Sequence, residues 1–436
     1  MLTFKGGIHP FEGKELSKDK EIQKYNPTSD VAISMSQHIG APATPVVKVG
    51  DEVKVGQLIG EASGFISANV HSSVSGKVKA IEKRLLVSGS KATCIVIAND
   101  GKNEKVVFPK PRDYKKLSKE EIIGFVKEAG VVGMGGAGFP TNVKLSPKEP
   151  DKIDYIIVNG SECEPYLTSD YRRLLEKPEA IIEGLNVMLS LFDHAKGIIA
   201  IEDNKPDVIK KLSELVKNEE KIEVKKLKTK YPQGAERMLI YAVTGRKINS
   251  SKLPADAGCI VDNVDTVHAI RNAVIYGKPL TKRVITVTGD AVNNPRNFLV
   301  PVGTNQRELV EAAGGFKNSP QKIISGGPMM GMAMSTLDVP VTKTSSAILA
   351  FEKDPLVDIT QTNCINCGRC VSVCPGQILP SRLAKFSMRG DMENFLAYNG
   401  LECCECGCCS YICPAKINLT QAIKSMRKMA LASKKK

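Results

Sequence analysis

Two near-identical cysteine runs close to the C-terminal end constrain this chain more than any other feature. Each run has the form C-x2-C-x2-C-x3-C followed by proline, and the two runs contain Cys364, Cys367, Cys370 and Cys374, then Cys403, Cys406, Cys409 and Cys413. In this spacing three neighbouring thiolates bind one [4Fe–4S] cubane, and the fourth thiolate, before the proline, binds the other cubane. The spacing predicts two [4Fe–4S] clusters, and therefore a chain that moves electrons.

The same spacing predicts how the eight ligands divide between the clusters. The first cluster takes three ligands from the first run and one from the second: Cys364, Cys367, Cys370 and Cys413. The second cluster takes the converse set: Cys403, Cys406, Cys409 and Cys374. A zinc ribbon is the alternative, because it also uses C-x2-C pairs. However, zinc needs only four ligands per ion and does not call for a third cysteine and a trailing proline twice over.

Length and composition indicate several globular domains. A chain of 436 residues usually divides into three or four domains, and 42% hydrophobic and 25% charged residues are ordinary for soluble proteins. No window reaches the roughly 18 consecutive apolar residues that span a bilayer. The first seven residues also lack the apolar core of a secretion signal. With 13 cysteines in addition, the sequence predicts a location in the reducing cytoplasm.

The formal net charge of +14 raises the question of a nucleic-acid partner. Part of this charge is offset, because two oxidised clusters with their thiolates carry roughly −2 each, which leaves about +10. Lysine is spread along the chain, tryptophan is absent, and no stretch alternates aromatic residues with arginine as a base-stacking surface would. The charge is better explained by docking to an anionic membrane face or to an acidic redox partner. No nucleic-acid partner is expected.

The rest of the chain changes character several times, and these changes predict its domains. Residues 1–35 are mixed and rich in turns. Residues 36–100 place β-branched residues between Gly and Asp turns, as in a small antiparallel sandwich. Residues 115–280 alternate helical and strand patterns, which favours an α/β sheet with crossover helices. Residues 282–335 hold short strands and a helix, and residues 354–433 hold both cysteine runs.

The segment between the cysteine runs predicts the type of cluster domain. Its two apolar patterns, Leu379–Met388 and Met392–Tyr398, have helical spacing. Compact ferredoxins often have shorter, sheet-forming spacers at this point. We therefore expect an α-helical dicluster domain, closed by a basic amphipathic helix after Pro414.

A glycine-rich segment supplies the second candidate site. It reads Gly133-Met134-Gly135-Gly136-Ala137-Gly138-Phe139-Pro140-Thr141-Asn142-Val143-Lys144. Its glycines let the backbone approach a ligand closely, and exposed N–H groups can bind a phosphate next to the lysine. The segment is neither a Walker loop nor a Rossmann fingerprint. Taken alone, it could equally be a tight turn that packs against a helix.

A second motif, Asn159-Gly160-Ser161-Glu162-Cys163-Glu164-Pro165, follows the predicted strand 155–158. Together the two motifs resemble those of the flavin-bearing, NADH-oxidising subunit of respiratory complex I, over residues 130–270. The resemblance implies that FMN is bound by the loop glycines and three side chains: Gly133, Gly135, Gly136, Gly138, Lys144, Asn159 and Glu162. It also implies that Phe139 stacks on NAD(H) and that Glu164 contacts it.

Two looser matches to that flavoprotein add further flavin contacts. Gly234 and Glu236 lie where it has a Gly-Glu-Glu turn, and Asn263 and Thr266 lie in a segment similar to its Asn-Asn-Val-Glu-Thr stretch. The chain departs from the pattern of that flavoprotein at four positions, which are Met134, Ser161, Cys163 and Ala235.

The order of the parts gives a resemblance over the whole chain. Residues 36–100 resemble a biotinyl/lipoyl-like barrel-sandwich domain in which Phe65 replaces the acceptor lysine, and residues 282–335 resemble a β-grasp (SLBB) domain. With the flavin-type domain, the dicluster domain and the opening Gly6-Gly7-Ile8-His9-Pro10, the chain resembles the RnfC family of the Rnf electron transport complex.

That family implies an oxidoreductase subunit, peripheral on the cytoplasmic side of the cell membrane. Electrons would pass between NAD(H), FMN and two [4Fe–4S] clusters, with ferredoxin as an indirect partner through the other subunits and with ion translocation coupled to the flow. A cobalamin reductase of bacterial microcompartments has similar domains and is one alternative. A non-catalytic electron wire that has lost its flavin is another.

Overall fold

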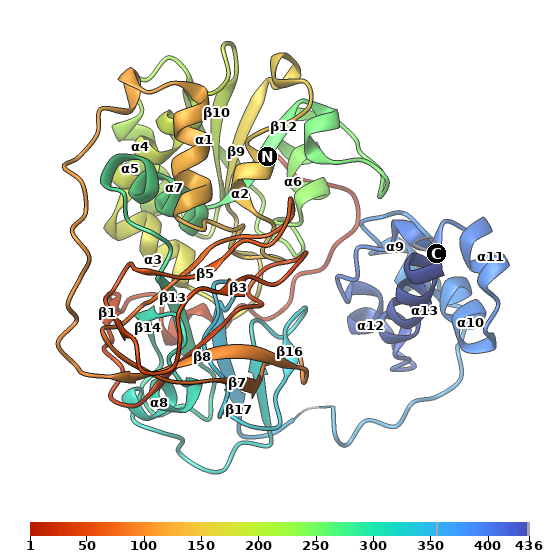
Figure 1. Ribbon diagram of the computed structural model, residues 1–436. Coiled ribbons are helices and arrows are strands. Elements are labelled where there is room, and N and C mark those ends of the chain that lie inside the picture. Colours follow the sequence, from red (N-terminus) through yellow and green to blue (C-terminus); the bar gives the residue numbers. More distant parts are fainter. Residues whose placement is uncertain (355, 434–436) are drawn as a thin grey trace.

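The computed structural model describes residues 1–354 and 356–433. In Figure 1 an α/β part lies above two β-rich parts, and a smaller helical part that carries the cysteine runs lies to one side. The N-terminal segment passes from the α/β part toward the helical part and back. Within the described ranges no helix is long and apolar enough to cross a bilayer.

The α/β part is built on a four-stranded parallel sheet with the order β11-β10-β9-β12. Its strands are β9 (Tyr155–Gly160), β10 (Lys196–Glu202), β11 (Ile222–Leu227) and β12 (Cys259–Asn263). Its helices are α1 (Lys119–Glu128), α2 (Thr141–Lys144), α3 (Ser169–Glu176), α4 (Pro178–Leu189), α5 (Pro206–Leu215), α6 (Glu236–Thr244) and α7 (Val264–Tyr276). Because helices cover both faces of the sheet, the side chains on both faces of the central strands are apolar.

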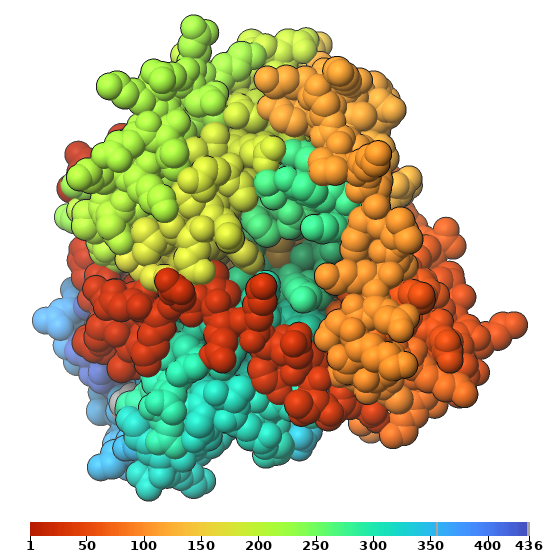
Figure 2. Space-filling view, turned by 90° about the vertical axis from the view of Figure 1, so that its left-hand side faces the viewer, coloured from red at the N-terminus to blue at the C-terminus, as the bar shows by residue number. Residues whose placement is uncertain are grey.

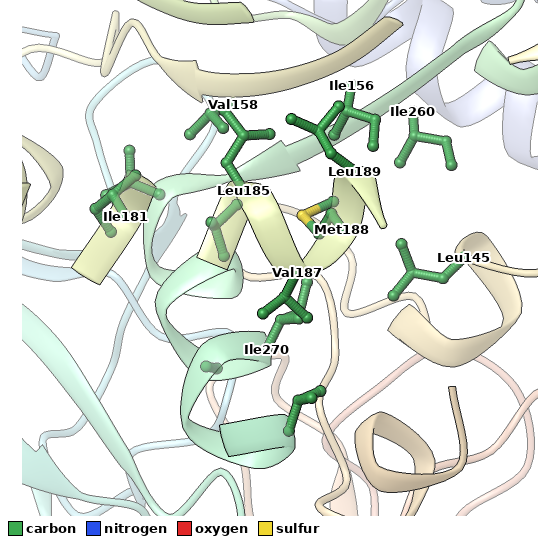
Figure 3. Packing of buried hydrophobic residues seen from close by; sticks show 14 of the residues in the cluster. Leu145, Ile156, Val158, Ile181, Leu185, Val187, Met188, Leu189, Ile260 and Ile270 are labelled. Atoms are coloured by element: carbon green, nitrogen blue, oxygen red, sulfur yellow. The ribbon is translucent and has the colours of Figure 1, made fainter. Parts of the chain in front are cut away.

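The main core lies between this sheet and helices α4 and α7 (Figure 3). Leu185 and Met188 of α4 pack between Ile156 of the sheet and Ile270 of α7, and all four side chains are buried. The opposite face of β9, with Ile157, packs against α6 in a separate cluster. Strand β9 is therefore held from both sides, and its carboxyl end has a fixed position.

The strand order creates a switch point beside β9. The chain moves outward from β9 to β10 and β11 and then returns to place β12 on the other side of β9. Open α/β sheets bind ligands in the crevice at the carboxyl ends of strands where the order reverses. Here those ends are Asn159 and Asn263, which are partners in the β9–β12 register.

The barrel-sandwich part has two antiparallel sheets. The larger sheet has the order β2-β8-β7-β4 and contains β2 (Val31–Ser34), β4 (Glu52–Val53), β7 (Gly76–Leu85) and β8 (Lys91–Asn99). The smaller sheet contains β3 (Thr44–Pro45), β5 (Leu58–Glu61) and β6 (Val70–His71). Because β2 pairs with β8, the sandwich begins before the predicted boundary at residue 36. Phe65 lies in the turn after β5 and is 83% exposed.

The β-grasp part is a six-stranded sheet with the order β1-β14-β13-β17-β15-β16, accompanied by helix α8 (Gln306–Ala312). Its strands are β1 (Gln23–Lys24), β13 (Lys282–Thr288), β14 (Arg296–Pro301), β15 (Lys322–Ser325), β16 (Met332–Ala333) and β17 (Ala347–Phe351). The sheet therefore extends beyond the predicted range 282–335. The reason is that β17 pairs with both β13 and β15, and β1 from the N-terminal segment pairs with β14.

The cysteine-bearing part is helical, as the spacing between the cysteine runs predicts. Its helices are α9 (Arg369–Ser372), α10 (Pro380–Arg389), α11 (Met392–Ala397), α12 (Cys408–Ile412) and α13 (Leu419–Ser433). The apolar face of α13, with Leu419, Ile423 and Met426, packs against Leu383 of α10 and Phe395 of α11. Short 3-10 helices complete the fold: η1 (Lys14–Leu16), η2 (Tyr114–Lys116), η3 (Pro150–Lys152), η4 (Pro254–Ala257) and η5 (Gly400–Glu402).

Candidate functional site

The glycine-rich loop leads from α1 into α2 and has a defined shape. The Gly133 N–H donates to the Phe139 carbonyl oxygen at 2.8 Å, which closes the loop. Gly135 and Gly138 have φ angles of 79° and 73°, in the left-handed region that favours glycine. Around Gly136 the loop is exposed, and a Cβ there would meet nothing within 4 Å. A backbone turn of this kind can present N–H groups to an anion.

The loop rests on the first turn of α7. The Met134 N–H donates to the Thr266 hydroxyl at 2.9 Å, and a Cβ on Gly135 would lie 3.1 Å from Asn263 Nδ2. Asn263 is the N-cap of α7, where its Oδ1 accepts from the Asp265 N–H at 2.9 Å. Helix N-termini favour anions. The two looser predictions, Asn263 and Thr266, are therefore brought together with the predicted glycine loop.

Lys144, at the end of α2, reaches the carboxyl end of β12. Its Nζ donates to the Val261 carbonyl oxygen at 2.7 Å and pairs with Asp262 Oδ1 at 3.0 Å. Burial opposes protonation of Lys144, but Asp262 and Glu236 together outweigh it and raise the lysine pKa. Lys144 is therefore held protonated beside the glycine loop, in an ion pair with Asp262. Glu236, at the start of α6, is a further charged neighbour that acts on the Lys144 pKa.

The turn after β9 is joined to the turn before α6. Asn159 Nδ2 donates to the Gly234 carbonyl oxygen at 2.9 Å, and the Gly234 N–H donates to Cys163 Sγ at 3.3 Å. A Cβ on Gly234 would lie 3.3 Å from the Ser161 side chain and 3.4 Å from both Asn159 Oδ1 and Cys163 Sγ. Glycine is thus the residue that lets these two turns meet. Predicted residues from separate segments come together at this point.

Glu162, a predicted flavin contact, also makes hydrogen bonds within the chain. Its carboxylate accepts from the backbone N–H groups of Asp170 and Tyr171, at 2.7 and 3.3 Å, at the start of α3. Burial raises its pKa. Its carboxylate therefore anchors the helix that follows the turn, and its contact with FMN stays a prediction.

Glu164 is held by the β-grasp part. Its two carboxylate oxygens accept from the N–H groups of Met329 and Met330, at 3.1 and 2.9 Å. Burial raises its pKa to about 7. The predicted contact with NAD(H) would have to share this carboxylate with the loop at residues 326–332, which is rich in glycine and methionine and is called the Gly-Met loop below. Phe139, the other residue predicted to contact NAD(H), is half-buried at the end of the glycine loop.

Three buried polar atoms near these turns have no hydrogen-bond partner among the described residues. They are Asp262 Oδ2, Ser161 Oγ and Gln233 Nε2. Buried polar groups are normally satisfied, so unpaired ones call for a ligand or water. A flavin mononucleotide has polar groups along its ring edge, ribityl chain and phosphate that could pair with them. The residues present therefore fit FMN at the switch point.

A buried lysine from the N-terminal segment braces the same turn, and sequence reasoning did not single it out. Lys14 Nζ donates to the carbonyl oxygens of Glu162, Glu164 and Leu167, at 2.8, 3.0 and 2.6 Å. It is 8% exposed, and burial lowers its pKa. Only its position in a turn-rich segment far from the motifs was visible in the sequence, which gave no signal of this contact.

The two cysteine runs have the same backbone geometry. A residue with positive φ precedes the second cysteine of each run: Asn366, at 55°, precedes Cys367, and Glu405, at 56°, precedes Cys406. A left-handed glycine follows that cysteine in both runs and caps the next short helix, Gly368 at 72° and Gly407 at 83°. Two loops of one shape imply two ligand sets of one kind.

A small cavity lies between the runs, and its walls include Cys374, Cys403, Cys406 and Cys409. These are the four ligands predicted for the second cluster. In residues 1–354 and 356–433 no three His, Cys, Asp or Glu side chains are grouped so that they could hold a single metal ion. A cubane differs from a single ion because its thiolates surround a core of iron and sulfide. The cavity walls fit such a core.

The cysteine-bearing part packs against the candidate flavin site through a shared apolar cluster. The contact involves the turn after β9 (residues 161–167, called the flavin turn below) and the turn before α6. Ile8, Tyr231, Cys406 and Cys408 are buried together, with Cys163 packed against them. Tyr231 lies three residues before Gly234, so the turn that contacts Asn159 also contacts the second cysteine run. The candidate flavin site and the candidate cluster cavity are thus neighbours.

Comparison with protein families matches four successive parts of the chain. The matches are the RnfC barrel sandwich hybrid domain at residues 2–102, the Nuo51 FMN-binding domain at 126–272, the SLBB domain at 284–333 and the 4Fe-4S binding domain at 357–379. The fold and these sites define an iron–sulfur flavoprotein.

Two curated relatives identify the family. The chain is 46% identical to a subunit of the proton-translocating ferredoxin:NAD(+) oxidoreductase complex of Clostridium ljungdahlii, over 88% of this chain and 84% of the relative. It is 44% identical to the corresponding subunit of the Na(+)-translocating complex of Acetobacterium woodii, over 100% of this chain and 98% of the relative. The chain belongs to this RnfC family of ion-translocating ferredoxin:NAD(+) oxidoreductase subunits.

A solved structure shares the fold at low sequence identity. It is a chain of NAD+-reducing [NiFe]-hydrogenase in the H2-reduced state, with a TM-score of 0.50 and 17% identity, over 74% of this chain and 62% of that chain. The flavoprotein fold predicted from the two motifs is confirmed by this likeness and by the family matches.

Proposed function

We propose that this chain is the NAD(H)-reactive subunit of an ion-translocating ferredoxin:NAD(+) oxidoreductase complex. It passes electrons between NAD(H), FMN and two [4Fe–4S] clusters. One observation carries the proposal: predicted FMN residues from four segments meet at the carboxyl ends of β9 and β12, beside a cavity lined by four predicted cluster ligands.

Different residues at the switch point would bind different parts of FMN and NAD(H). Lys144 and the N–H groups of the glycine loop would bind the FMN phosphate, because both offer positive charge or donors on the same side of the site. Asn159 and Gly234 hold two turns together and would orient the flavin ring. Phe139 would stack on the nicotinamide dinucleotide. When bound, FMN supplies the exchange between hydride transfer and single-electron transfer.

The eight cysteines of the two runs would hold the clusters that receive or deliver single electrons. The match to a 4Fe-4S binding domain covers the first run, and the repeated backbone geometry supports an equivalent second cluster. Among the eight, Cys367 is exposed while Cys374, Cys406, Cys409 and Cys413 are buried. The first cluster is therefore nearer to the surface and suits exchange with another subunit.

We place the subunit peripherally on the cytoplasmic side of a membrane-bound complex. Its surplus of positive charge, +14 before cofactors are counted, suits an anionic membrane face or an acidic partner. Ferredoxin would exchange electrons with it only through other subunits.

FMN binding tests the proposal directly. Flavin fluorescence should be quenched when FMN is added to flavin-free protein. Lys144→Met should weaken the affinity at least about tenfold, because a hydrogen bond to a charged group contributes about 1.5–3 kcal/mol. Lys148→Met is the matched control, since Lys148 is exposed four residues further on, and it should bind FMN as the wild type does. A wild-type protein that leaves FMN fluorescence unchanged would contradict the proposal.

A further inference from the structure

The N-terminal segment forms a strap that crosses from the flavin-type sheet to the cluster part. Leu2 forms a parallel bridge with Leu227 of β11, and Ile8 forms an antiparallel bridge with Tyr231. In that bridge each N–H donates to the opposite carbonyl oxygen at 2.9 Å. Figure 1 shows the segment running between the α/β part and the helical part. Beyond the strap, the N-terminal segment continues over the face away from the helical part, where it forms a red band between the yellow-green and teal parts of the surface (Figure 2).

Two glycines of the strap lie directly against a predicted cluster ligand. The Gly7 N–H donates to the Val373 carbonyl oxygen at 2.8 Å. A Cβ on Gly6 would lie 2.8 Å from the Cys374 carbonyl oxygen and 2.9 Å from that of Val373. Gly6 and Gly7 also have φ angles of 86° and 79°. Both the close approach and the backbone conformation therefore favour glycine at these two positions.

The same junction holds a second ligand of the same predicted cluster. The Tyr231 hydroxyl donates to the Cys406 carbonyl oxygen at 2.8 Å, and Tyr231 is 1% exposed. Glu402, next to the ligand Cys403, pairs with Arg237 of α6 at 2.7 Å. Three ligand regions of the second cluster thus contact the flavin-type domain or its strap.

We propose that the strap Gly6–Ile8 positions the second cluster, held by Cys374, Cys403, Cys406 and Cys409, against the flavin turn, and that this contact sets the rate of electron transfer between them. The inference rests on the proposed function. With both groups bound, one electron would pass from reduced flavin to the oxidised second cluster, and no covalent bond would form or break. Because electron transfer slows steeply with distance, a strap that is displaced slightly would slow this step and leave hydride transfer from NADH unchanged.

The test uses the holoprotein with the variants Gly6→Ala and Gly7→Ala. Gly89→Ala is the matched control, because Gly89 has a φ of 77° and a Cβ there would meet nothing within 4 Å. After anaerobic mixing with NADH, stopped-flow absorbance follows flavin bleaching and cluster reduction separately. We expect unchanged flavin bleaching in all three variants, and cluster reduction slower by about tenfold or more in the two strap variants only, as small misplacements can cause.

Hydrogen–deuterium exchange supplies a readout that does not depend on turnover. The N–H groups of Ile8 and Tyr231, which donate to each other's carbonyl oxygens, should exchange faster in the strap variants than in the wild type and the Gly89→Ala control, with about eight irons retained. If the alanine variants lose iron, Ile8→Ala carries the test, because it removes packing against Tyr231 without altering the glycine backbone. Cluster reduction at the wild-type rate in iron-replete strap variants would overturn the inference. Absence of flavin bleaching in the wild type would instead contradict the proposed function.

Discussion

Arg283 Nη1 donates to Asp265 Oδ2 at 3.1 Å, in a buried salt bridge that joins the β-grasp sheet to the first turn of α7. Arg173 of α3 binds the other oxygen of the same carboxylate at 2.7 Å. Burial opposes ionisation of Asp265, but the two guanidinium groups outweigh it and lower its pKa to about 2. This carboxylate therefore fixes the helix end that carries Asn263 and Thr266.

Asp265→Asn should be strongly destabilising, because it leaves two buried guanidinium groups without their carboxylate. Removing one partner of a buried ion pair typically costs about 3–5 kcal/mol. Asp338→Asn is the matched control, since Asp338 pairs with Arg307 at the surface, where such a pair contributes about 1 kcal/mol or less. Apparent melting temperatures of the two variants provide the measurement. Equal losses would show that the Asp265 pair does not brace the site.

The folded-state pKa of Asp265 also predicts how the stability of the protein changes with pH. Because this pKa lies below the ordinary value of 3.8, the stabilisation is complete above pH 3.8 and is lost as the pH falls toward 2. The difference in melting temperature between the wild type and Asp265→Asn should therefore shrink as the pH falls toward 2. A difference that stays constant between pH 5 and pH 3 and below would contradict the ion pair.

Lys343 should make stability rise with pH. Its Nζ donates to the carbonyl oxygens of Asn69 and Gly130, at 2.6 and 2.7 Å. These bonds join the β-grasp part to the barrel-sandwich part and to the α/β part. Burial lowers the pKa of Lys343 to about 7, so above pH 7 the unfolded chain binds more protons than the folded one. From pH 7 to pH 9 the wild type should gain about 2 kcal/mol relative to Lys343→Met.

Melting curves at the two pH values would measure this gain, with Lys83→Met as the control at an exposed lysine. The control should follow the wild type at both pH values. Parallel behaviour of Lys343→Met and the wild type would show that the buried lysine does not titrate in this range.

Cysteine variants should separate ligands from spare thiols. Cys374→Ser should disrupt the second cluster and lower the iron content from about eight toward about four per chain. Cys404 lines the same cavity but lies outside the repeated C-x2-C-x2-C-x3-C spacing. Cys404→Ser should therefore leave the iron content unchanged. Iron analysis after anaerobic purification provides the measurement. Loss of a cluster in Cys404→Ser would show that the predicted ligand set is wrong.

Glu164→Ala should loosen the Gly-Met loop of the β-grasp part. The substitution removes the acceptor of the Met329 and Met330 N–H groups, so these amides should exchange with deuterium faster. Glu149→Ala is the control, because Glu149 pairs with Lys152 at the surface. If exchange at the loop is unchanged while NADH affinity falls, Glu164 contacts the nucleotide and does not brace the loop.

Much of the fold could be predicted because local patterns agree with it. The alternation of helical and strand patterns over residues 115–280 became the α/β sheet with its helices, and the spacer patterns became α10 and α11. Asn159 and Asn263 could be matched one by one to a family, and the strand order then places them in register. The spacing of the cysteines likewise predicts four that share the cavity, Cys374, Cys403, Cys406 and Cys409, although Cys404 and Cys408 line it too.

The remaining features depend on contacts between distant segments. The N-terminal residues look like turns in the sequence, yet β1 and β2 complete two different sheets and Lys14 braces the flavin turn. No periodicity reveals such pairing, because strands as short as β1 and β2 contain too few residues to show a pattern. Glu164 was assigned a ligand contact from its motif, whereas its hydrogen bonds come from a loop far along the chain.

Anaerobic titration with NADH tests the central claim most directly, with iron, sulfide and flavin measured beforehand. The account predicts one FMN and about eight irons per chain, followed by bleaching of both flavin and clusters as NADH is added. A protein with eight irons but no flavin and no response to NADH would contradict the account and leave only an electron wire.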